Sequence, residues 1–198
     1  LNTDVDYAPS HQQIAARALK NHCLALLADT ASETARQLVM QQYDAQHNMT
    51  DVMAALTIAA HGDDAMTGER LLADFAERWK AMPLVMDKWF SVQATSPQPG
   101  ALTRIEALRA HPAFSLTNPN RVRALIGAMV MANPVTFHRS DGAGYRLLAD
   151  TVIELNSLNP QIAARLLRQM SRWRRYDSSR QSLMKTELER VAAVPDLS

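Results

Sequence analysis

Arginine side chains gather in one short segment of the chain. Six of them lie between residues 161 and 180, where Asp177 is the single acid: Arg165, Arg168, Arg172, Arg174, Arg175 and Arg180. A guanidinium group is a planar set of donors that matches the oxygens of a carboxylate or a phosphate. The segment therefore predicts one of three arrangements. These are a solvated, ion-paired helix face, a cavity wall that holds a carboxylate, and a surface that binds a phosphate backbone.

Two arginines follow proline residues at similar spacings. Arg123 lies four residues after Pro119, and Arg165 lies five residues after Pro160. Each proline comes directly after an asparagine, and asparagine at the N-cap with proline at the first helical position is a start signal for a helix. Arg123 and Arg165 are therefore candidates for side chains that bind a carboxylate in a cavity.

Motifs for catalysis and metal binding are missing from the sequence. None of the six histidines is followed by Glu and then by a second His four residues on, so the zinc-hydrolase helix motif is absent. The single cysteine, Cys23, excludes a thiolate zinc site and is expected to be a small buried apolar residue. The histidine and carboxylates at 61–64 are interpreted as a solvated loop. We therefore predict no catalytic residue, no metal site and no cofactor in this chain.

The composition indicates a globular protein with little net charge. Of the 198 residues, 47% are hydrophobic and 21% are charged, and the formal net charge is +1. These values exclude an intrinsically disordered chain and predict a single domain over residues 1–198, with neither nucleic acid nor a membrane as partner. Apolar runs such as 124–132 are too short to span a bilayer. A single cysteine fits a reducing compartment, so a cytoplasmic location is expected.

Apolar residues recur at helical spacing along the whole chain, and helix-capping residues separate the periodic segments. The caps expected are Thr30 with Glu33, Asn48, Asn118, Asn133, Asp141, Asn159 and Asp177. The helices expected are 11–28, 31–43, 49–60, 69–81, a helix from Pro83, one around 102–108, 119–132, 134–139, 142–157, 160–176 and 178–193. The break at 96–100 is interpreted as a loop inside one architecture.

Short loops between many helices favour either a bundle or a stacked solenoid. No strict period of 34 or 40 residues is present, so the sequence by itself supports no named repeat family. The fold class predicted is all-α, an irregular, α-solenoid-like superhelix of stacked antiparallel helix pairs.

Seven short segments resemble, in order, those of a known family. They are Asn48–Asp51, Leu84–Phe90, Gln93–Pro97, Asn118–Gly127, Phe137–His138 with Asp141–Tyr145, Asn159–Ala163, and Arg175–Asp177. Together they resemble the C-terminal helical domain of bacterial aminopeptidase N, a zinc-dependent M1 aminopeptidase. The resemblance runs from the first helix to about residue 192.

The resemblance implies a role for the chain and for two of its residues. The family's domain is an all-α superhelix, and the zinc ligands and catalytic groups belong to a preceding catalytic domain that this chain lacks. The chain would cap the active-site cavity and restrict which peptides enter, with its own catalytic domain and peptide substrates as partners. Arg123 and Arg165 match family arginines that face the cavity, where they approach the carboxylate end of a bound peptide.

Two function classes remain open from the sequence. One is this non-catalytic gating domain of a zinc aminopeptidase. The alternative is a free-standing helical-repeat scaffold that binds a partner peptide or protein through its concave face. Phosphate or nucleic-acid binding by the arginine segment is a weaker third reading. The start Leu1-Asn2-Thr3 has no initiator methionine and no leader pattern, which is typical of a piece of a longer protein.

Overall fold

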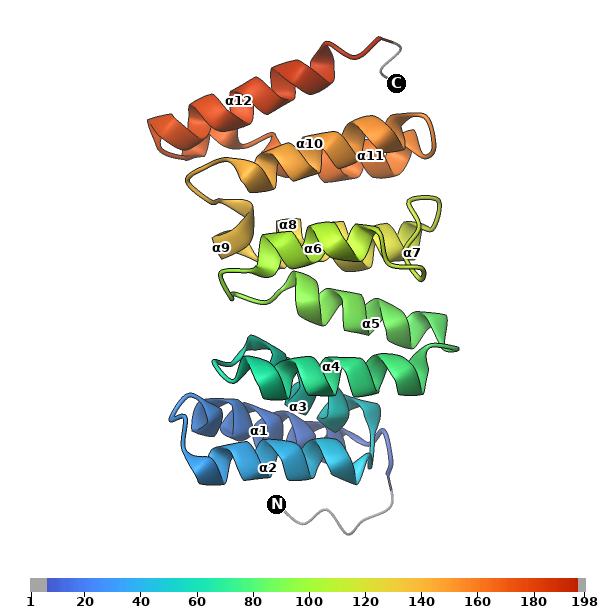
Figure 1. Cartoon of the computed structure of the whole chain (residues 1–198), viewed down its shortest axis with the longest axis vertical. Helices are drawn as coiled ribbons and strands as arrows, with labels where there is room; N and C mark the ends of the chain where they lie inside the picture. Colours follow the sequence, from blue (N-terminus) through green and yellow to red (C-terminus); the bar gives the residue numbers. More distant parts are fainter. Residues whose placement is uncertain (1–6, 196–198) are drawn as a thin grey trace. The chain divides into compact units, whose positions relative to one another are not determined.

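The computed structural model describes residues 7–195, and every regular element among them is helical (Figure 1). Leu1–Thr3 lie outside the described residues. The elements are α1 (His11–Ala28), α2 (Glu33–Ala45), α3 (Met49–His61), α4 (Ala65–Trp79), α5 (Pro83–Ala94), α6 (Ala101–Arg109), α7 (Pro119–Val122), the π-helix η1 (Arg123–Gly127), α8 (Ala128–Ala132), α9 (Pro134–Phe137), α10 (Ala143–Asn156), α11 (Pro160–Leu167), the 3₁₀ helices η2 (Arg168–Met170) and η3 (Trp173–Arg175), and α12 (Ser178–Ala192). The predicted all-α class is confirmed.

The chain divides into two compact units, Leu1–Ala81 and Met82–Ser198. The boundary falls between α4 and α5. The proline-rich loop at 96–100, which is the strongest break in the sequence, lies inside the second unit. The single domain expected over residues 1–198 stays a prediction.

In the first unit, α2 packs on α1 and α3, and α3 packs on α4 (Figure 1). Leu56, Leu71 and Phe75 form the centre of its core and are at most 1% exposed. Tyr43 is equally buried, and its hydroxyl donates to Asp74 Oδ2 at 2.8 Å. Each helix therefore buries an apolar stripe against a neighbour, as helices in stacked arrays must.

A buried carboxylate joins α1 to α3 in the same unit. Asp51 is 4% exposed and accepts from Lys20 Nζ at 2.5 Å, from Asn21 Nδ2 at 2.9 Å and from Asn48 Nδ2 at 2.9 Å. Burial raises the pKa of Asp51, but the hydrogen bonds from Lys20, Asn48 and Asn21 outweigh burial and hold the pKa below its ordinary value. The ionised Asp51 therefore stabilises the contact between the two helices.

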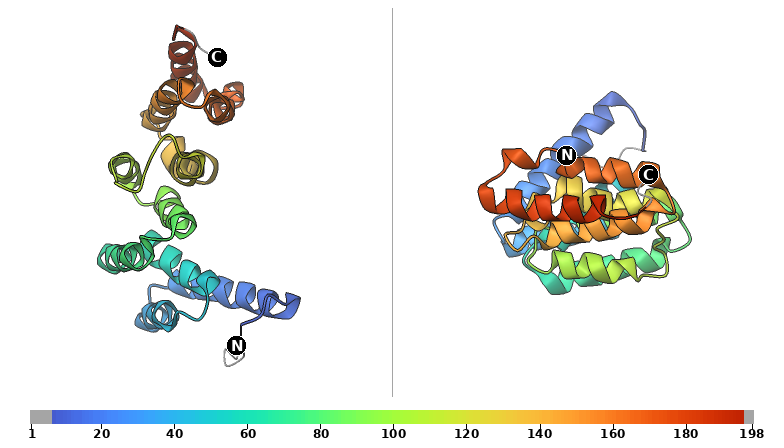
Figure 2. Two further views of the ribbon diagram at one scale, coloured as in Figure 1. Left: turned by 90° about the vertical axis from the view of Figure 1, so that its right-hand side faces the viewer. Right: turned by 90° about the horizontal axis from the view of Figure 1, so that it is seen from above.

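In the second unit, α5 contacts α6 and η1, and α10 contacts α11 and α12 (Figures 1 and 2). Its largest fully buried side chains include Phe90, Ile105, Leu125, Phe137 and Tyr145. They come from successive helices, so the core continues from one packed pair to the next.

Most predicted helix starts are confirmed. Asn48, Asn118, Asn133, Asn159 and Asp177 each accept a backbone N–H of the first helical turn. This is the N-capping bond that their sequence positions predict. The three prolines at the first helical position also lie where they were expected.

The predicted cap at Thr30 is wrong. The Thr30 hydroxyl donates to the Leu27 carbonyl at 2.7 Å, beyond the end of α1. Ser32 caps α2 instead, and its Oγ accepts the N–H of Ala35 at 3.2 Å. Two hydroxyl residues stand two positions apart here, so the sequence does not say which of them ends one helix and which begins the next.

The helix predicted at 69–81 begins earlier, at Ala65, with Asp64 as its N-cap. Gly68 lies inside this helix and is buried. A Cβ there would stand 2.8 Å from the carbonyl oxygen of Ala59, so Gly68 lets α4 approach the backbone of α3 closely. The sequence had predicted a loop, and not a helix, at Gly68.

The predicted cap at Asp141 is displaced by one position. The N-cap residue of α10 is Gly142, and the helix begins at Ala143. The Asp141 carboxylate still accepts the N–H of Ala143 at 3.1 Å. Arg139 also binds this carboxylate, and the two interactions lower the pKa of Asp141 to about 2.

Candidate functional site

Arg123 lies where a helical run changes its hydrogen-bonding pattern. Asn118 Oδ1 accepts from the N–H groups of Asn120 and Arg121 at 3.0 and 3.4 Å, and Pro119 opens α7. The helix predicted over 119–132 is present without a break, but its residues 123–127 form the π-helix η1. A π turn holds more residues than an α turn, so it changes the direction in which later side chains point, and such turns are frequent at functional sites.

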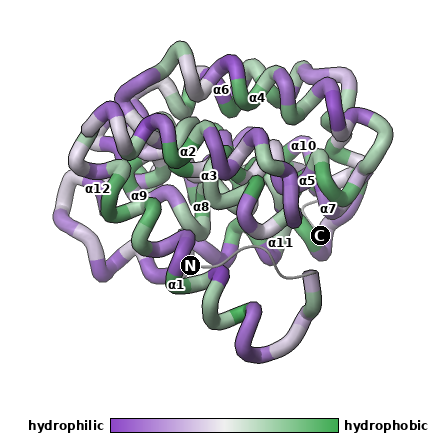
Figure 3. Tube along the Cα trace, turned by 90° about the horizontal axis from the view of Figure 1, so that it is seen from below, coloured by the Kyte–Doolittle hydropathy of each residue, from purple (hydrophilic) through white to green (hydrophobic). Residues whose placement is uncertain are grey.

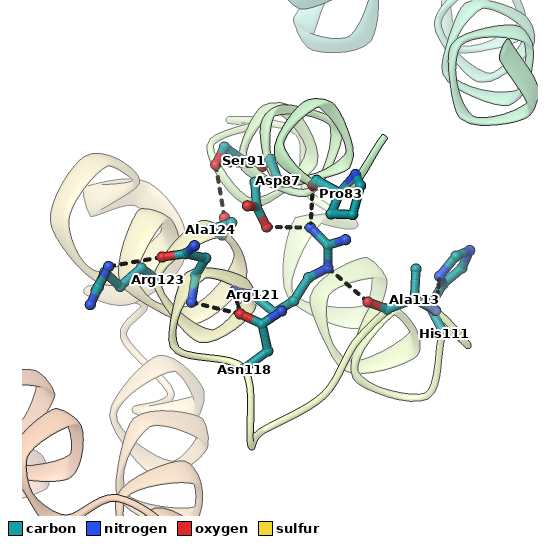
Figure 4. A network of polar contacts seen from close by, with 10 residues as sticks. Pro83, Asp87, Ser91, His111, Ala113, Asn118, Arg121, Arg123 and Ala124 are labelled. Carbon is teal, nitrogen blue, oxygen red and sulfur yellow. Dashed lines mark hydrogen bonds and ion pairs between the residues drawn. The ribbon is translucent and has the colours of Figure 1, made fainter. Parts of the chain in front are cut away.

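A buried arginine anchors the start of this run (Figure 4). Arg121 is 6% exposed. Its Nε donates to the Ala113 carbonyl at 2.8 Å, and its Nη1 donates to the Pro83 carbonyl at 2.8 Å and pairs with Asp87. The guanidinium also stands 5.4 Å from the ring centre of Phe90. Arg121 therefore ties α7 to α5 and to the loop before α7, which fixes the backbone that carries Arg123.

The π-helix has a side-chain donor of its own. The Ser91 hydroxyl on α5 stands 3.0 Å from the carbonyl oxygen of Ala124 (Figure 4). A π turn changes which amide each carbonyl accepts from, so an outside donor helps to satisfy a buried carbonyl there. The sequence gives no local sign of this contact, because Ser91 and Ala124 are 33 residues apart.

Arg165 lies on α11. The prediction of one helix over 160–176 is wrong beyond Leu167. The α-helix ends at Leu167 and continues as the 3₁₀ segments η2 and η3. Tertiary hydrogen bonds hold the last part of this stretch. The Tyr176 hydroxyl lies 3.2 Å from His138 Nε2, and the Gln181 side chain donates to the Tyr176 carbonyl at 2.7 Å. These bonds outweigh the local helical preference of the sequence.

The structure places Arg123 and Arg165 on the wall of one cavity of about 580 Å³. Arg123 comes from the start of η1 and Arg165 from α11. Arg168 and Arg172 line the same cavity, and Met131, Ile162 and Leu166 supply apolar wall. Among the described residues that line it, none is Asp or Glu.

The arginines of this cavity lack the ion pairs that other arginines of the chain have. Arg109 pairs with Glu154 at 2.6 Å, for example, and Arg190 with Asp150 at 2.7 Å. Among residues 7–195, no ion pair joins Arg123, Arg165, Arg168 or Arg172 to a carboxylate, and Arg123 Nη1 donates to Asn120 Oδ1 at 3.0 Å. All four arginines are exposed, so this wall is solvated but not ion-paired. Its unpaired guanidinium groups can bind an external carboxylate or phosphate.

The other arginines of the 161–180 segment point to different partners. Arg174 stacks over the ring of Trp173 at 4.4 Å from the ring centre. Arg180 donates to the His138 carbonyl at 2.9 Å and pairs with Asp177 at 2.8 Å. The segment thus divides into a cavity wall and a structural part. Arg168 and Arg172 were predicted only as members of the arginine segment, with no individual role.

A second polar cluster lies beside α9. His138 Nδ1 is 2.8 Å from the Tyr145 hydroxyl, and His138 Nε2 is 3.2 Å from the Tyr176 hydroxyl. Burial, together with the positive charge of Arg180, lowers the pKa of His138. Both ring nitrogens therefore have protein partners, and the cluster links α9, α10 and the segment before α12.

Metal-binding side chains do not gather within residues 7–195, where no group of three or more His, Cys, Asp and Glu could hold a metal ion. Cys23 is exposed rather than buried as predicted, and it lines a cavity of about 370 Å³ beside α1. No helix in the described part of the chain is both long and apolar enough to cross a membrane.

Comparisons with known proteins agree with the resemblance in the sequence. A family model described as "Domain of unknown function (DUF3458_C) ARM repeats" matches residues 1–198. The chain is 45% identical over 193 residues to aminopeptidase N of Haemophilus influenzae and 41% identical over 197 residues to aminopeptidase N of Escherichia coli. These matches cover 98% and 100% of this chain but 22% of each relative, so the chain spans about a fifth of their length.

A solved structure shows the same fold. The crystal structure of Legionella pneumophila aminopeptidase A in complex with aspartic acid matches 96% of this chain and 23% of that protein, with a TM-score of 0.88 and 31% identity. The family model also corrects the reading that no named repeat family is supported. The repeats have no strict period because their helices differ in length, from 18 residues in α1 to four in α9. Taken together, these matches show that the chain belongs to the DUF3458_C family of ARM-repeat domains, the C-terminal helical domain of aminopeptidase N.

Proposed function

We propose that the chain is the non-catalytic gating domain of a cytoplasmic, zinc-dependent aminopeptidase, and that Arg123 and Arg165 hold the C-terminal carboxylate of a peptide substrate. The observation that carries this proposal is the cavity of about 580 Å³, where both arginines lie on the wall and no lining residue that the structure describes is acidic. A short peptide ends in a planar anion, and a guanidinium group offers a matching pair of donors.

Arg123 and Arg165 come from two different helices, which suits this role. Arg123 is carried by a backbone that Arg121 and Ser91 fix against α5, and Arg165 is carried by α11. A carboxylate has enough lone pairs to accept from two guanidinium groups. Because the two arginines stand on separate helices, they fix the position of the bound carboxylate. A peptide whose C-terminus reaches that position is bound, and a longer peptide is excluded.

The chemistry of peptide cleavage would come from outside this chain. A zinc ion held in the catalytic domain would polarise the scissile carbonyl and activate a water molecule. The residues of this chain would bind and orient the far end of the substrate, which is a contribution to substrate binding and not to the bond-breaking step.

An apolar surface on α1 fits contact with that catalytic domain. Leu24 is the one residue of α1 that is buried, whereas Ile14, Leu19, Leu26 and Leu27 are 47% to 57% exposed. Figure 3 shows hydrophobic and hydrophilic residues alternating along this helix. Leu19 and Leu26 are seven residues apart and share one side of the helix, which fits an apolar interaction surface.

The test is a comparison of substrates with and without a carboxylate. In the full-length aminopeptidase, Arg123→Ala or Arg165→Ala should raise KM for tripeptides by about tenfold, the effect of one lost charge-assisted contact. The same changes should leave KM for an amino-acid anilide, which has no carboxylate, within about twofold. Arg175→Ala is the matched control, because Arg175 is exposed on the same segment and does not line the cavity. Equal effects on both substrates would refute the proposed role.

A further inference from the structure

The cavity holds more positive charge than one carboxylate uses. Four arginines line it, and two of them are sufficient to bind the single carboxylate of a peptide terminus. Like charges placed together without counter-ions repel one another, so the arrangement is stabilised by whatever anions enter. The two arginines that the proposed function leaves unused are Arg168 and Arg172.

Arg168 and Arg172 follow Arg165 along the wall of the cavity. Ile162 and Arg165 on α11, Arg168 at the start of η2 and Arg172 after it all line the cavity, so together they form one stripe of its wall. A rise of about 1.5 Å per residue sets Arg168 about 5 Å beyond Arg165 along the axis. That separation is within the reach of the side chain of a single bound residue.

We propose that Arg168 and Arg172 form a second anion subsite, and that it selects peptides whose last residue is Asp or Glu. This inference rests on the proposed function, because it takes the terminal carboxylate to be held by Arg123 and Arg165. The side-chain carboxylate of the same residue then meets Arg168 and Arg172 along the stripe. The substrate class is a short peptide with two carboxylates at its C-terminal end.

The wall of the cavity favours an acidic peptide over a phosphate backbone. Met131, Ile162 and Leu166 line it beside the arginines, and apolar wall suits the aliphatic part of a peptide residue. The second subsite is therefore a local feature that recognises a side chain.

The experiment compares two tripeptides that differ in charge but hardly in shape. In the full-length aminopeptidase, kcat/KM for Ala-Ala-Glu should exceed that for Ala-Ala-Gln by about tenfold, the contribution of one charge-assisted contact. The double variant Arg168→Gln, Arg172→Gln should bring this ratio close to one. Arg175→Gln should keep it, since Arg175 lies outside the cavity. The ratio should also fall as salt is added, because the wall is open to solvent.

The outcomes separate this inference from the proposed function. A ratio near one in the unmodified enzyme, or a ratio that the double variant leaves unchanged, would overturn the second subsite. Neither result affects the comparison of peptides with anilides, which tests Arg123 and Arg165 alone. Conversely, if those two arginines prove irrelevant while the double variant abolishes the Glu/Gln ratio, an acidic subsite exists but the terminal carboxylate is held elsewhere. Circular dichroism of each variant confirms that it is folded.

Discussion

Removing the guanidinium of Arg121 is the sharpest test of how the candidate site is held in place. In Arg121→Met the apolar part of the side chain is kept, so packing changes little. What is lost are the donors to the Ala113 and Pro83 carbonyl oxygens and the ion pair with Asp87. The two carbonyl oxygens and the Asp87 carboxylate then lose the donors that the guanidinium supplied.

The expected loss of stability follows from how deeply the pair is buried. The side chains of Arg121 and Asp87 are 7% and 18% exposed. Breaking a buried ion pair by removing one partner destabilises a protein by about 3–5 kcal/mol, because the other charge is left unpaired. Asp87 keeps some access to water, so we expect the lower end, about 3 kcal/mol. Changing Asp87 to Asn in the same chain should restore about 1 kcal/mol, since an amide is less costly to bury than a charge.

Urea unfolding followed by far-ultraviolet circular dichroism measures these free energies. Arg146→Met is the matched control: the Arg146 side chain is 61% exposed, and its ion pair with Glu187 is 3.9 Å long. A pair of this length, with the arginine in solvent, contributes less than about 1 kcal/mol. If Arg121→Met were no more destabilising than Arg146→Met, the network would not anchor α7, and the account of how Arg123 is positioned would be wrong.

Two further predictions concern the packing of each unit. Asp51→Asn should lower the free energy of unfolding by about 3 kcal/mol at neutral pH, because Lys20 is left partly buried without its partner. The folded pKa of Asp51 lies below 3.8, so its contribution is complete above about pH 4 and is lost as pH falls through the folded value. Urea unfolding at neutral pH and at about pH 3 should show a smaller gap between wild type and variant in acid; an equal gap would contradict this. Gly144→Ala should lower the free energy of unfolding by about 3 kcal/mol, because the new Cβ would stand 2.4 Å from the Phe137 carbonyl oxygen. Gly100→Ala is the control, because a Cβ there meets open space, and it should change the free energy of unfolding by less than about 1 kcal/mol. Similar thermal midpoints for the two variants would refute the close approach at Gly144.

Local signals in the sequence predicted most of the helix starts. Asn118, Asn133 and Asn159 act as N-caps through bonds to residues two or three positions away, so their effect can be recognised from the sequence alone. The π turn after Val122 and the end of α11 could not be predicted in this way. They depend on Ser91 and Tyr176, whose partners lie far along the chain.

The candidate site was predicted in part for the same reason. Arg123 and Arg165 were singled out, and the structure brings them to one cavity. Arg168 and Arg172 were not, because their place on that wall depends on where α11 changes to the 3₁₀ segment η2. In a regular helix the spacing from Arg165 would place Arg168 and Arg172 on one face, but the α-helix ends at Leu167.

The unpaired arginines of the cavity do not result from a shortage of acids. The chain has 21 lysines and arginines and 20 aspartates and glutamates, nearly a balance. Other arginines of the second unit have carboxylate partners at 2.5 to 2.8 Å. An acid four residues from Arg165 or Arg168 would relieve the repulsion on this wall at no cost to the core, and residues 161, 164, 169 and 172 include none. The four cavity arginines therefore do not stabilise the fold through ion pairs. Their position is explained if a bound ligand supplies the missing negative charge.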